Sequence, residues 1–146
     1  MALYSSHAII VMSRRYLLNK EHEEFGFLFP GGKFTDNDVR RAKSEGWYKV
    51  SREVLERKLR EELNPTKILI GDLVEVLPDE IVTENYRFYP IEQMWFYLAD
   101  IEPHNFYELK RRTSIPLRLM SRKEIEKEVI SNAMKKVLKK LPRHYP

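Results

Sequence analysis

Between positions 50 and 64 the chain carries its most constraining pattern, a helix with a definite end. Its apolar residues recur at helical spacing and are Val50, Val54, Leu55, Leu59 and Leu63. We expect Ser51 to be the N-cap of this helix. Asn64 suits a left-handed C-cap, and Pro65 prevents the helix from continuing. The fold must therefore bury the apolar stripe of one long helix that ends at a fixed point.

Strand-like runs lie on both sides of this helix. The predicted strands are Ala8–Met12 and Tyr16–Leu18, paired as a hairpin across Ser13–Arg15, then Phe25–Phe29, Lys67–Leu77, and Tyr86–Ile101 with a bend at Pro90. The strand Phe25–Phe29 is expected to stop at Pro30-Gly31-Gly32. The pattern indicates an α/β protein with a mixed central sheet.

Two further helices are predicted outside the central one. A short helix lies between Thr35 and Trp47, capped by Thr35 or Asp36 and ended by Gly46. Near the C-terminus, Ser121 and Glu124 form a capping box that opens a helix. Beyond it, an apolar stripe faces a basic side; the stripe is Ala133, Met134, Val137, Leu138 and Leu141, and the basic side is Lys135, Lys136, Lys139 and Lys140.

Length and composition narrow the class of protein. A chain of 146 residues fits one domain, so we expect residues 1–146 to form a single unit. The sequence has no apolar run long enough for a membrane span and no signal-peptide pattern at its start, and cytoplasmic location is the default expectation. Cysteine is absent, which excludes disulfides and thiolate metal sites.

The charge is distributed unevenly along the chain. From Leu109 onward there are 12 Lys or Arg and 3 Asp or Glu, whereas the first 108 residues hold 14 and 19. A basic C-terminal helix is compatible with binding RNA or a phosphate-rich ligand. A solvated helix face explains the same residues, and we favour that interpretation.

The chemistry is concentrated in two features that follow one another. The first is the loop Gly31-Gly32-Lys33, where glycine allows a close approach that a side chain would block. The second is the end of the central helix, which carries Glu61 and Glu62 side by side. Adjacent carboxylates on a rigid helix need a cation against them, and Mg²⁺ accepts one or two carboxylates together with substrate phosphates. The two features together predict a site where a phosphate and a metal meet.

This combination resembles the Nudix box, whose pattern is Gly-x5-Glu-x7-Arg-Glu-U-x-Glu-Glu-x-Gly-U, with U a bulky apolar residue. The segment from Phe29 to Lys33 is similar to the strand and loop that lead into the box. The segment from Arg57 to Asn64 is similar to the end of its helix. Together with the flanking strands, the resemblance covers nearly the whole chain. It implies a Nudix-like α/β/α sandwich with a mixed central sheet.

The sequence departs from the Nudix box at several positions. Lys58 stands where the family has the first glutamate after its arginine, and Asn64 replaces the glycine. The distance from Gly32 to Arg57 is about eleven positions longer than in the family pattern, which indicates an insertion at about 34–49. The early glutamate of the box would fall on Lys49. The box is therefore degenerate.

A second register is open to the same helix. Arg52-Glu53-Val54-Leu55-Glu56 reproduces the Arg-Glu-U-x-Glu start of the box without a break. This register places Arg57 on the second carboxylate and runs the helix well past its expected end. The register that begins at Arg57 is preferred because the helix then stops where the family's helix stops.

The resemblance assigns roles to particular residues. Glu61, Glu62, Lys58 and Arg57 are the catalytic candidates, and Gly31, Gly32, Lys33 and Arg14 are the candidates for substrate binding. The metal, Mg²⁺ or Mn²⁺, is expected on Glu61, Glu62 and Glu108. Lys58 has two interpretations. It replaces the charge of a metal in a protein that no longer hydrolyses, or it turns aside to contact phosphate while the carboxylates hold one metal.

The implied function is a metal-dependent pyrophosphohydrolase that cleaves a nucleoside diphosphate linked to another moiety. The alternative is a catalytically degenerate module that binds RNA, a nucleotide or a protein partner. A third, weaker interpretation is sugar transfer from a nucleotide sugar by substitution at carbon. A homodimer is compatible with the sequence, whereas a membrane partner is not expected.

Overall fold

The computed structural model describes residues 3–21, 23–82, 88–129 and 131–146. The strands are β1 (Tyr4–Ile9), β2 (Val11–Met12), β3 (Arg15–Asn19), β4 (Gly31–Lys33), β5 (Lys67–Val82), β6 (Phe88–Glu102) and β7 (Leu117–Met120). The helices are the 3₁₀ turn η1 (Glu23–Phe25), α1 (Asp36–Glu45), α2 (Trp47–Leu63), α3 (Phe106–Arg111), α4 (Arg122–Glu128) and α5 (Asn132–Leu138).

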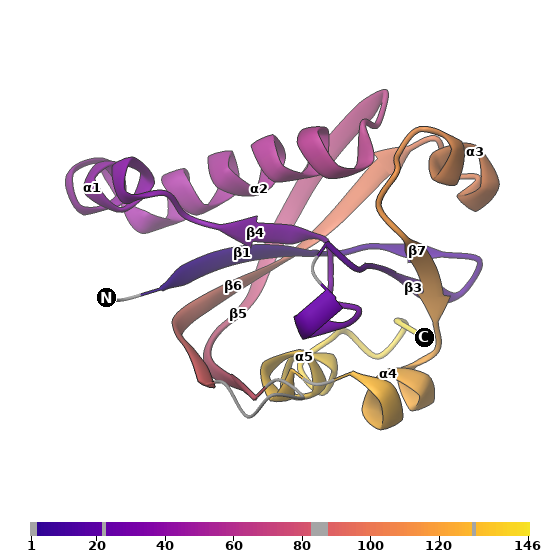
Figure 1. Ribbon diagram of the computed structural model, residues 1–146. Coiled ribbons are helices and arrows are strands. Elements are labelled where there is room, and N and C mark those ends of the chain that lie inside the picture. The colour runs from indigo at the N-terminus through magenta and orange to yellow at the C-terminus, as the bar shows by residue number, and fades with distance from the viewer. Residues whose placement is uncertain (1–2, 22, 83–87, 130) are drawn as a thin grey trace.

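The centre of the molecule is a mixed sheet with the strand order β4-β1-β6-β5. Strand β1 runs parallel to β6, whereas its pairing with β4 and the pairing of β5 with β6 are antiparallel. A smaller antiparallel sheet has the order β2-β3-β7. Figure 1 shows α1 and α2 along one face of the main sheet, and α4 and α5 on the other. The layers form an α/β/α sandwich, as the sequence predicts.

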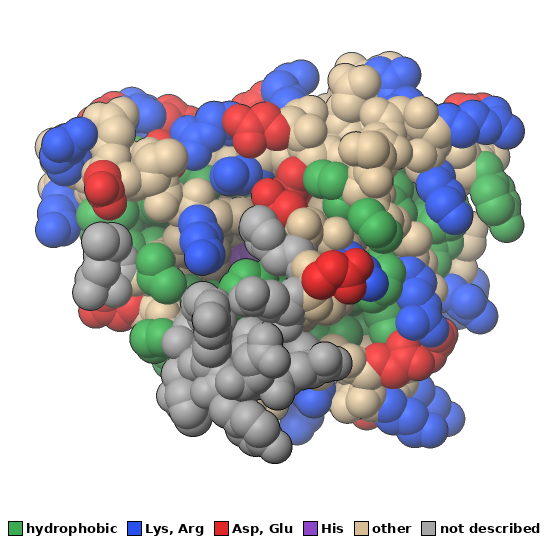
Figure 2. Space-filling model, viewed as in Figure 1, with side chains coloured by type: hydrophobic (Ala, Val, Ile, Leu, Met, Phe, Trp, Pro, Cys, Tyr) green, Lys and Arg blue, Asp and Glu red, His purple; other side chains and the backbone are tan. Residues whose placement is uncertain are grey.

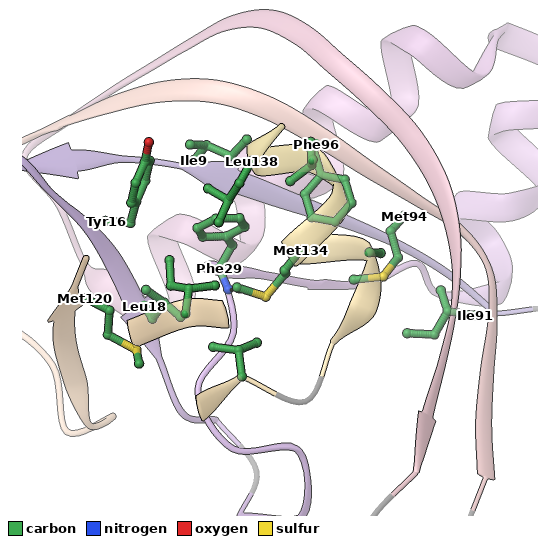
Figure 3. Close-up of a cluster of buried hydrophobic side chains, with 14 residues drawn as sticks. Ile9, Tyr16, Leu18, Phe29, Ile91, Met94, Phe96, Met120, Met134 and Leu138 are labelled. Carbon is green, nitrogen blue, oxygen red and sulfur yellow. Dashed lines mark hydrogen bonds between the residues drawn. The ribbon is translucent and has the colours of Figure 1, made fainter. Parts of the chain in front are cut away.

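Each face of the main sheet has its own apolar core. On the α2 side, Leu55, Leu59 and Leu63 pack with Ala8 and Tyr97 and have no measurable exposure. On the other side, side chains from β1, β3 and β6 meet helix α5. Figure 3 shows Phe29, Phe96, Met94 and Met134 within that cluster. The alternation of residues along β1 sends successive side chains to opposite cores.

Local sequence signals explain where the predicted helices begin and end. The hydroxyl of Thr35 accepts a hydrogen bond from the backbone N–H of Asp38, and the Asp38 carboxylate accepts one from the N–H of Thr35. This reciprocal pair opens α1, which ends at Gly46. Helix α2 ends at Asn64 in the left-handed conformation, with φ 46°. Ser121 and Glu124 form the expected capping box of α4.

The structure corrects the prediction of a strand over Phe25–Phe29. That segment contains the end of the 3₁₀ turn η1, then Gly26 at φ 67°, and only an isolated bridge between Leu28 and Asn19. The strand lies later, at Gly31–Lys33, so the glycines that were expected to stop a strand form one. A side chain at Gly31 would collide with β1, and therefore the close pairing of the two strands requires glycine there.

The N-cap assigned to Ser51 is also wrong. Helix α2 begins at Trp47, immediately after Gly46 has ended α1, and Ser51 lies inside the helix. Trp47 packs against Tyr4 and Phe34, with ring centroids 4.7 and 6.0 Å away, which fixes this earlier start. Ser51 is buried and shares a hydrogen bond with the hydroxyl of Tyr97.

The C-terminal helix is interrupted. Helix α4 ends at Glu128, and the hydroxyl of Ser131 accepts a hydrogen bond from the N–H of Met134 to open α5. The apolar stripe is nevertheless buried at Ala133, Met134, Val137 and Leu138. The predicted strand start at Tyr86 lies outside the described residues. Within those residues, no helix is both long and apolar enough to cross a membrane.

Candidate active site

Glu62 is the residue around which the site is built. It lies on the last turn of α2, and only 4% of it is exposed. Its Oε2 atom accepts a hydrogen bond from the side-chain amide of Asn19, 2.9 Å away, and one from the backbone N–H of Gly31, 3.4 Å away. Its Oε1 atom is buried and has no hydrogen-bond donor among the described residues. A buried carboxylate oxygen without a donor is costly unless a proton or a cation lies against it.

The carboxyl group of Glu21 also makes ionisation of Glu62 less favourable. Burial, followed by the neighbouring Glu21 carboxyl, raises the pKa of Glu62 to about 8, against the lowering effect of the Asn19 amide. Two neighbouring carboxyl groups repel each other when both are ionised, so a proton or a cation between them is favoured. At neutral pH the pair therefore attracts one positive charge, either a proton or a metal ion.

Gly31 and Gly32 bring the backbone of β4 against this carboxylate. Gly31 has φ 149°, and a β-carbon there would lie 1.9 Å from the carbonyl oxygen of Ser6. At Gly32, a β-carbon would lie 2.8 Å from Cδ of Lys58. The first collision is with backbone, which cannot move aside, and the second is with a flexible side chain. The two glycines thus leave room for a strand and for the lysine stem, respectively.

The side-chain stem of Lys58 lies over Gly32. Its ammonium group is 3.8 Å from the carboxylate of Glu61, which is more than half exposed. Lys33 is the second basic residue at this site, and its ammonium lies 5.7 Å from the ring centre of Phe25. Both lysines line the same cavity, so positive charge is available beside the glycine strand.

Arg57 has a structural partner outside the carboxylate group. Its guanidinium donates two hydrogen bonds to the carboxylate of Asp38 on α1, over 3.0 and 2.6 Å. Burial raises the pKa of Asp38, but the hydrogen bonds from Arg57 and Thr35 outweigh it and bring the pKa to about 2. Arg57 therefore fastens helix α1 to helix α2.

A cavity of about 130 Å³ adjoins these residues. Its polar lining includes Asn19, Glu21, Lys33 and Lys58, together with Gly31 and Gly32. Figure 2 shows basic and acidic side chains around a hollow in which a histidine side chain is visible. The apolar lining comprises Leu3, Phe25, Leu28, Phe29, Ile91 and Met94. The cavity thus joins charged groups suited to phosphate with apolar groups suited to an aromatic ring.

Sequence reasoning missed four of the residues that shape this site. Asn19 and Glu21 lie at the end of strand β3 and just after it, and Ser5 and His7 lie on strand β1. The ring of His7 is buried and stacks on Phe96, with ring centroids 5.7 Å apart. Nothing local in the sequence distinguishes His7 from an incidental histidine. The alternation of side chains along the strand from Ser5 to Ile9 is the signal that could have placed Ser5 and His7 on one face.

The structure does not assemble the carboxylates that were predicted to hold the metal. Glu108 lies on α3 and lines a different depression, with Glu102, His104, Arg111 and Arg112. Among the described residues, no three Asp, Glu, His or Cys side chains approach closely enough to hold a metal ion. The reason is geometric, because Glu62 points inward to β4 while its neighbour Glu61 points outward. Among the described residues, Arg14, Arg57 and Glu61 do not line the cavity, and neither does Glu62, which lies behind Asn19 and Gly31.

Arg14 occupies the turn of the hairpin between β2 and β3. Both Ser13 and Arg14 have positive φ angles, 51° and 63°, as in a tight two-residue hairpin turn. The side chain of Arg14 is exposed. A role in contacting phosphate stays a prediction.

The residues present fit a divalent ion of the magnesium type better than a thiolate- or imidazole-bound metal. Mg²⁺ needs only one or two protein carboxylates, since waters and substrate phosphates complete its coordination. The buried Oε1 atom of Glu62 and the nearby Glu21 carboxyl supply such oxygens.

Comparison with known proteins identifies the fold. No protein-family model matches the sequence, and no curated protein matches it either. Several solved structures match the fold of this protein. A Nudix hydrolase from Nitrosomonas europaea is 13% identical, with 96% of this chain and 88% of that chain covered and a TM-score of 0.64. The MutT protein of the Nudix family from a methicillin-resistant Staphylococcus aureus is 18% identical, with 96% and 95% covered and a TM-score of 0.59.

A third structure agrees with these two. The MutT protein from Methanosarcina mazei is 16% identical, with 94% of this chain and 91% of that chain covered and a TM-score of 0.56. The protein therefore has the Nudix fold, and this holds over almost the whole length of both this chain and its structural neighbours.

Proposed function

We propose that the protein is a Mg²⁺-dependent pyrophosphohydrolase acting on a nucleoside diphosphate linked to another moiety. One observation carries the proposal: the inward-facing carboxylate of Glu62 has an unpaired oxygen, among the described residues, next to the glycine strand. The fold supports the proposal, because two of the structural neighbours named above are described as Nudix hydrolases.

The buried carboxylate pair and the cavity beside it have separate roles in this proposal. Glu62 and Glu21 would hold the metal, with waters and substrate phosphates completing its coordination. Bound there, the metal would neutralise charge on the phosphates and favour attack by water. The N–H of Gly31 donates to Glu62, which keeps that carboxylate turned toward β4. Lys58 and Lys33 bind phosphate oxygens from the other side.

The position of Lys58 favours the second of its two interpretations. Its ammonium is paired with Glu61 at 3.8 Å, while Glu62 faces Asn19 and Gly31. Lys58 therefore does not take the place of a metal against Glu62. Glu62 can then bind the cation, while Lys58 binds phosphate.

The proposal is tested by turnover. The protein is incubated with a panel of dinucleotides, sugar nucleotides, nucleoside triphosphates and capped RNA, with Mg²⁺ or with EDTA. We expect Mg²⁺-dependent release of a nucleoside monophosphate or of phosphate from at least one class. Glu62→Gln should lower the rate about 100-fold or more. Glu126→Gln, a matched change on the exposed face of α4, should leave the rate unchanged.

Two results would refute the proposal. One is a protein inert toward the whole panel. The other is binding of RNA or nucleotide that survives EDTA and is insensitive to Glu62→Gln, which would favour the degenerate binding module. For a sugar-nucleotide substrate, inversion at the anomeric carbon would instead assign substitution at carbon. Cytoplasmic location, RNA binding by the C-terminal helix, homodimer formation and the 34–49 insertion stay predictions from the sequence.

A further inference from the structure

Strand β1 presents a buried pair of polar side chains to the cavity. Ser5 and His7 are two positions apart on the strand, so both point to the same face, and both line the cavity. Ser5 is 2% exposed and His7 is 5% exposed. Ser6 points the other way and donates its hydroxyl hydrogen to the carbonyl oxygen of Ser51 on α2.

The hydrogen bonds of this pair determine which atom donates and which atom accepts each hydrogen. Nδ1 of His7 lies 2.9 Å from the carbonyl oxygen of Phe29, which can only accept, so Nδ1 carries the proton. Burial lowers the pKa of His7, and the ring is therefore neutral at pH 7. Its Nε2 atom is then an acceptor, and the Ser5 hydroxyl, 2.9 Å away, donates to it. Ser5 has used its only hydrogen, so its oxygen can only accept from a ligand.

The size of the cavity limits what can reach Ser5. An apolar cavity of about 150 Å³ takes one benzene ring. The cavity here measures about 130 Å³, and its apolar wall is formed by side chains that include Phe25, Leu28, Phe29, Ile91 and Met94. It therefore accommodates one six-membered ring, and the second ring of a purine would have to remain outside.

We propose that the cavity is a base pocket that selects a single-ring base presenting an amino group to Ser5, which favours cytosine nucleotides over uracil nucleotides. The inference rests on the proposed function, because it takes the ligand to be a nucleotide. Cytosine carries an amino donor at the position where uracil carries a carbonyl acceptor. In the same orientation, uracil would place its oxygen against the lone pairs of Ser5.

Binding of nucleoside monophosphates tests this inference separately from catalysis. CMP, UMP and AMP contain no phosphoanhydride bond, so their affinity does not depend on hydrolysis. In calorimetric titrations of the whole chain with Mg²⁺ present, CMP should bind about ten-fold more tightly than UMP. CMP should also bind more tightly than AMP. Equal or tighter binding of UMP would refute the claim that Ser5 accepts a hydrogen bond from the base. Equal or tighter binding of AMP would refute the claim that the pocket holds only one ring.

Two neighbouring serines provide a matched pair of variants. Ser5→Ala removes the acceptor, and the preference for CMP over UMP should fall to about two-fold or less. Ser6→Ala, on the opposite face of the same strand, should keep the ten-fold preference. A preference that survives Ser5→Ala would overturn the assignment. Circular dichroism and thermal unfolding establish that each variant is folded before its affinities are compared.

The tautomer of His7 can be measured in the wild-type protein alone. Two-bond ¹H–¹⁵N correlation spectra at pH 7 should show a protonated Nδ1 and an unprotonated Nε2. A proton on Nε2, or a doubly protonated ring, would overturn the inference even if every variant failed to fold. Hydrolysis without a base preference would refute this inference only, whereas CMP selectivity without hydrolysis would refute only the proposed activity.

Discussion

Gly31 and Glu62 meet across the space between strand β4 and helix α2, where the backbone N–H of the glycine donates to Oε2 of the glutamate over 3.4 Å. The contact joins residues 31 positions apart in the sequence. It turns the carboxylate inward and leaves Oε1 buried without a donor among the described residues. Only the register that begins at Arg57 places a glutamate of the box at this point.

The metal-free protein should lose stability as the pH rises from about 4.5 to about 8. The pKa of Glu62 is raised from its ordinary value of 4.5 to about 8 in the folded protein, chiefly by burial. The folded state therefore binds more protons than the unfolded state within this window, and stability is lost as the pH rises. Glu62→Gln removes the effect, because a neutral amide does not ionise.

Urea unfolding in EDTA measures this difference. Glu62→Gln and wild type should be about equally stable at pH 4.5, and the variant should be about 1 to 3 kcal/mol more stable at pH 8. Comparing the two proteins removes the contribution of the other titrating groups. A constant difference across the range would show that Glu62 ionises normally.

Replacing Lys58 by methionine should weaken nucleotide binding while leaving metal binding intact. Methionine keeps an unbranched stem over Gly32 but removes the ammonium that faces Glu61. We expect about a ten-fold higher KM for the hydrolysed substrate and a similar Mg²⁺ requirement. If Lys58→Met instead raised the affinity for Mg²⁺ several-fold, the lysine would be standing in for the metal.

Arg57→Lys should loosen helix α1 from helix α2. Lysine cannot form the two parallel hydrogen bonds that the guanidinium makes to Asp38, and we expect a loss of about 1 to 2 kcal/mol at pH 7. The pKa of Asp38 is depressed to about 2, so this stabilisation is present above about pH 4 and is lost as the pH falls toward 2. Thermal unfolding at pH 7 and pH 2 measures both effects.

The control for this change is Arg41→Lys. Arg41 pairs with Glu45 and Glu53 on an exposed surface, where ion pairs contribute little. A loss from Arg41→Lys as large as that from Arg57→Lys would contradict a special role for the Arg57–Asp38 pair.

Gly31→Ala should destabilise the fold strongly, and more than the same change at Gly26. The new β-carbon would meet the Ser6 carbonyl at 1.9 Å, so β4 would have to separate from β1. We expect a loss of about 3 kcal/mol or more in chemical unfolding. Gly26→Ala is the matched control, since Gly26 also has positive φ but has open space around it, and it should cost about 1 kcal/mol. Equal losses would attribute the effect to the φ angle alone.

The sequence predicts the helices and strands around this site better than the side chains that form it. The end of α2 at Asn64, the capping boxes at Thr35 and Ser121, and the mixed sheet all follow from local chemistry. The strand at Gly31–Lys33 does not, because two glycines have no strand propensity of their own. It forms because β1 accepts a close neighbour only where there is no side chain.

The side chains of the site are held together by contacts between residues that lie far apart in the sequence. Asn19 reaches Glu62 across 43 positions, and His7 reaches the Phe29 carbonyl across 22. No local pattern indicates either partner. The Nudix resemblance directed attention to Glu62, which does face the glycine strand, but it also suggested Glu108, which lies in a different depression on α3. A family pattern constrains the helix that carries it, whereas the loops that complete a site are specific to each chain.

Calorimetric titration of Mg²⁺ in the presence of a non-hydrolysable nucleoside diphosphate analogue tests the central claim most directly. The claim is that the inward-facing carboxylate of Glu62 holds a divalent cation next to the glycine strand. Wild type and Glu126→Gln should bind Mg²⁺ with the same affinity, and Glu62→Gln should bind it at least about ten-fold more weakly. Unchanged binding in Glu62→Gln, or no Mg²⁺ binding in the wild type, would contradict it.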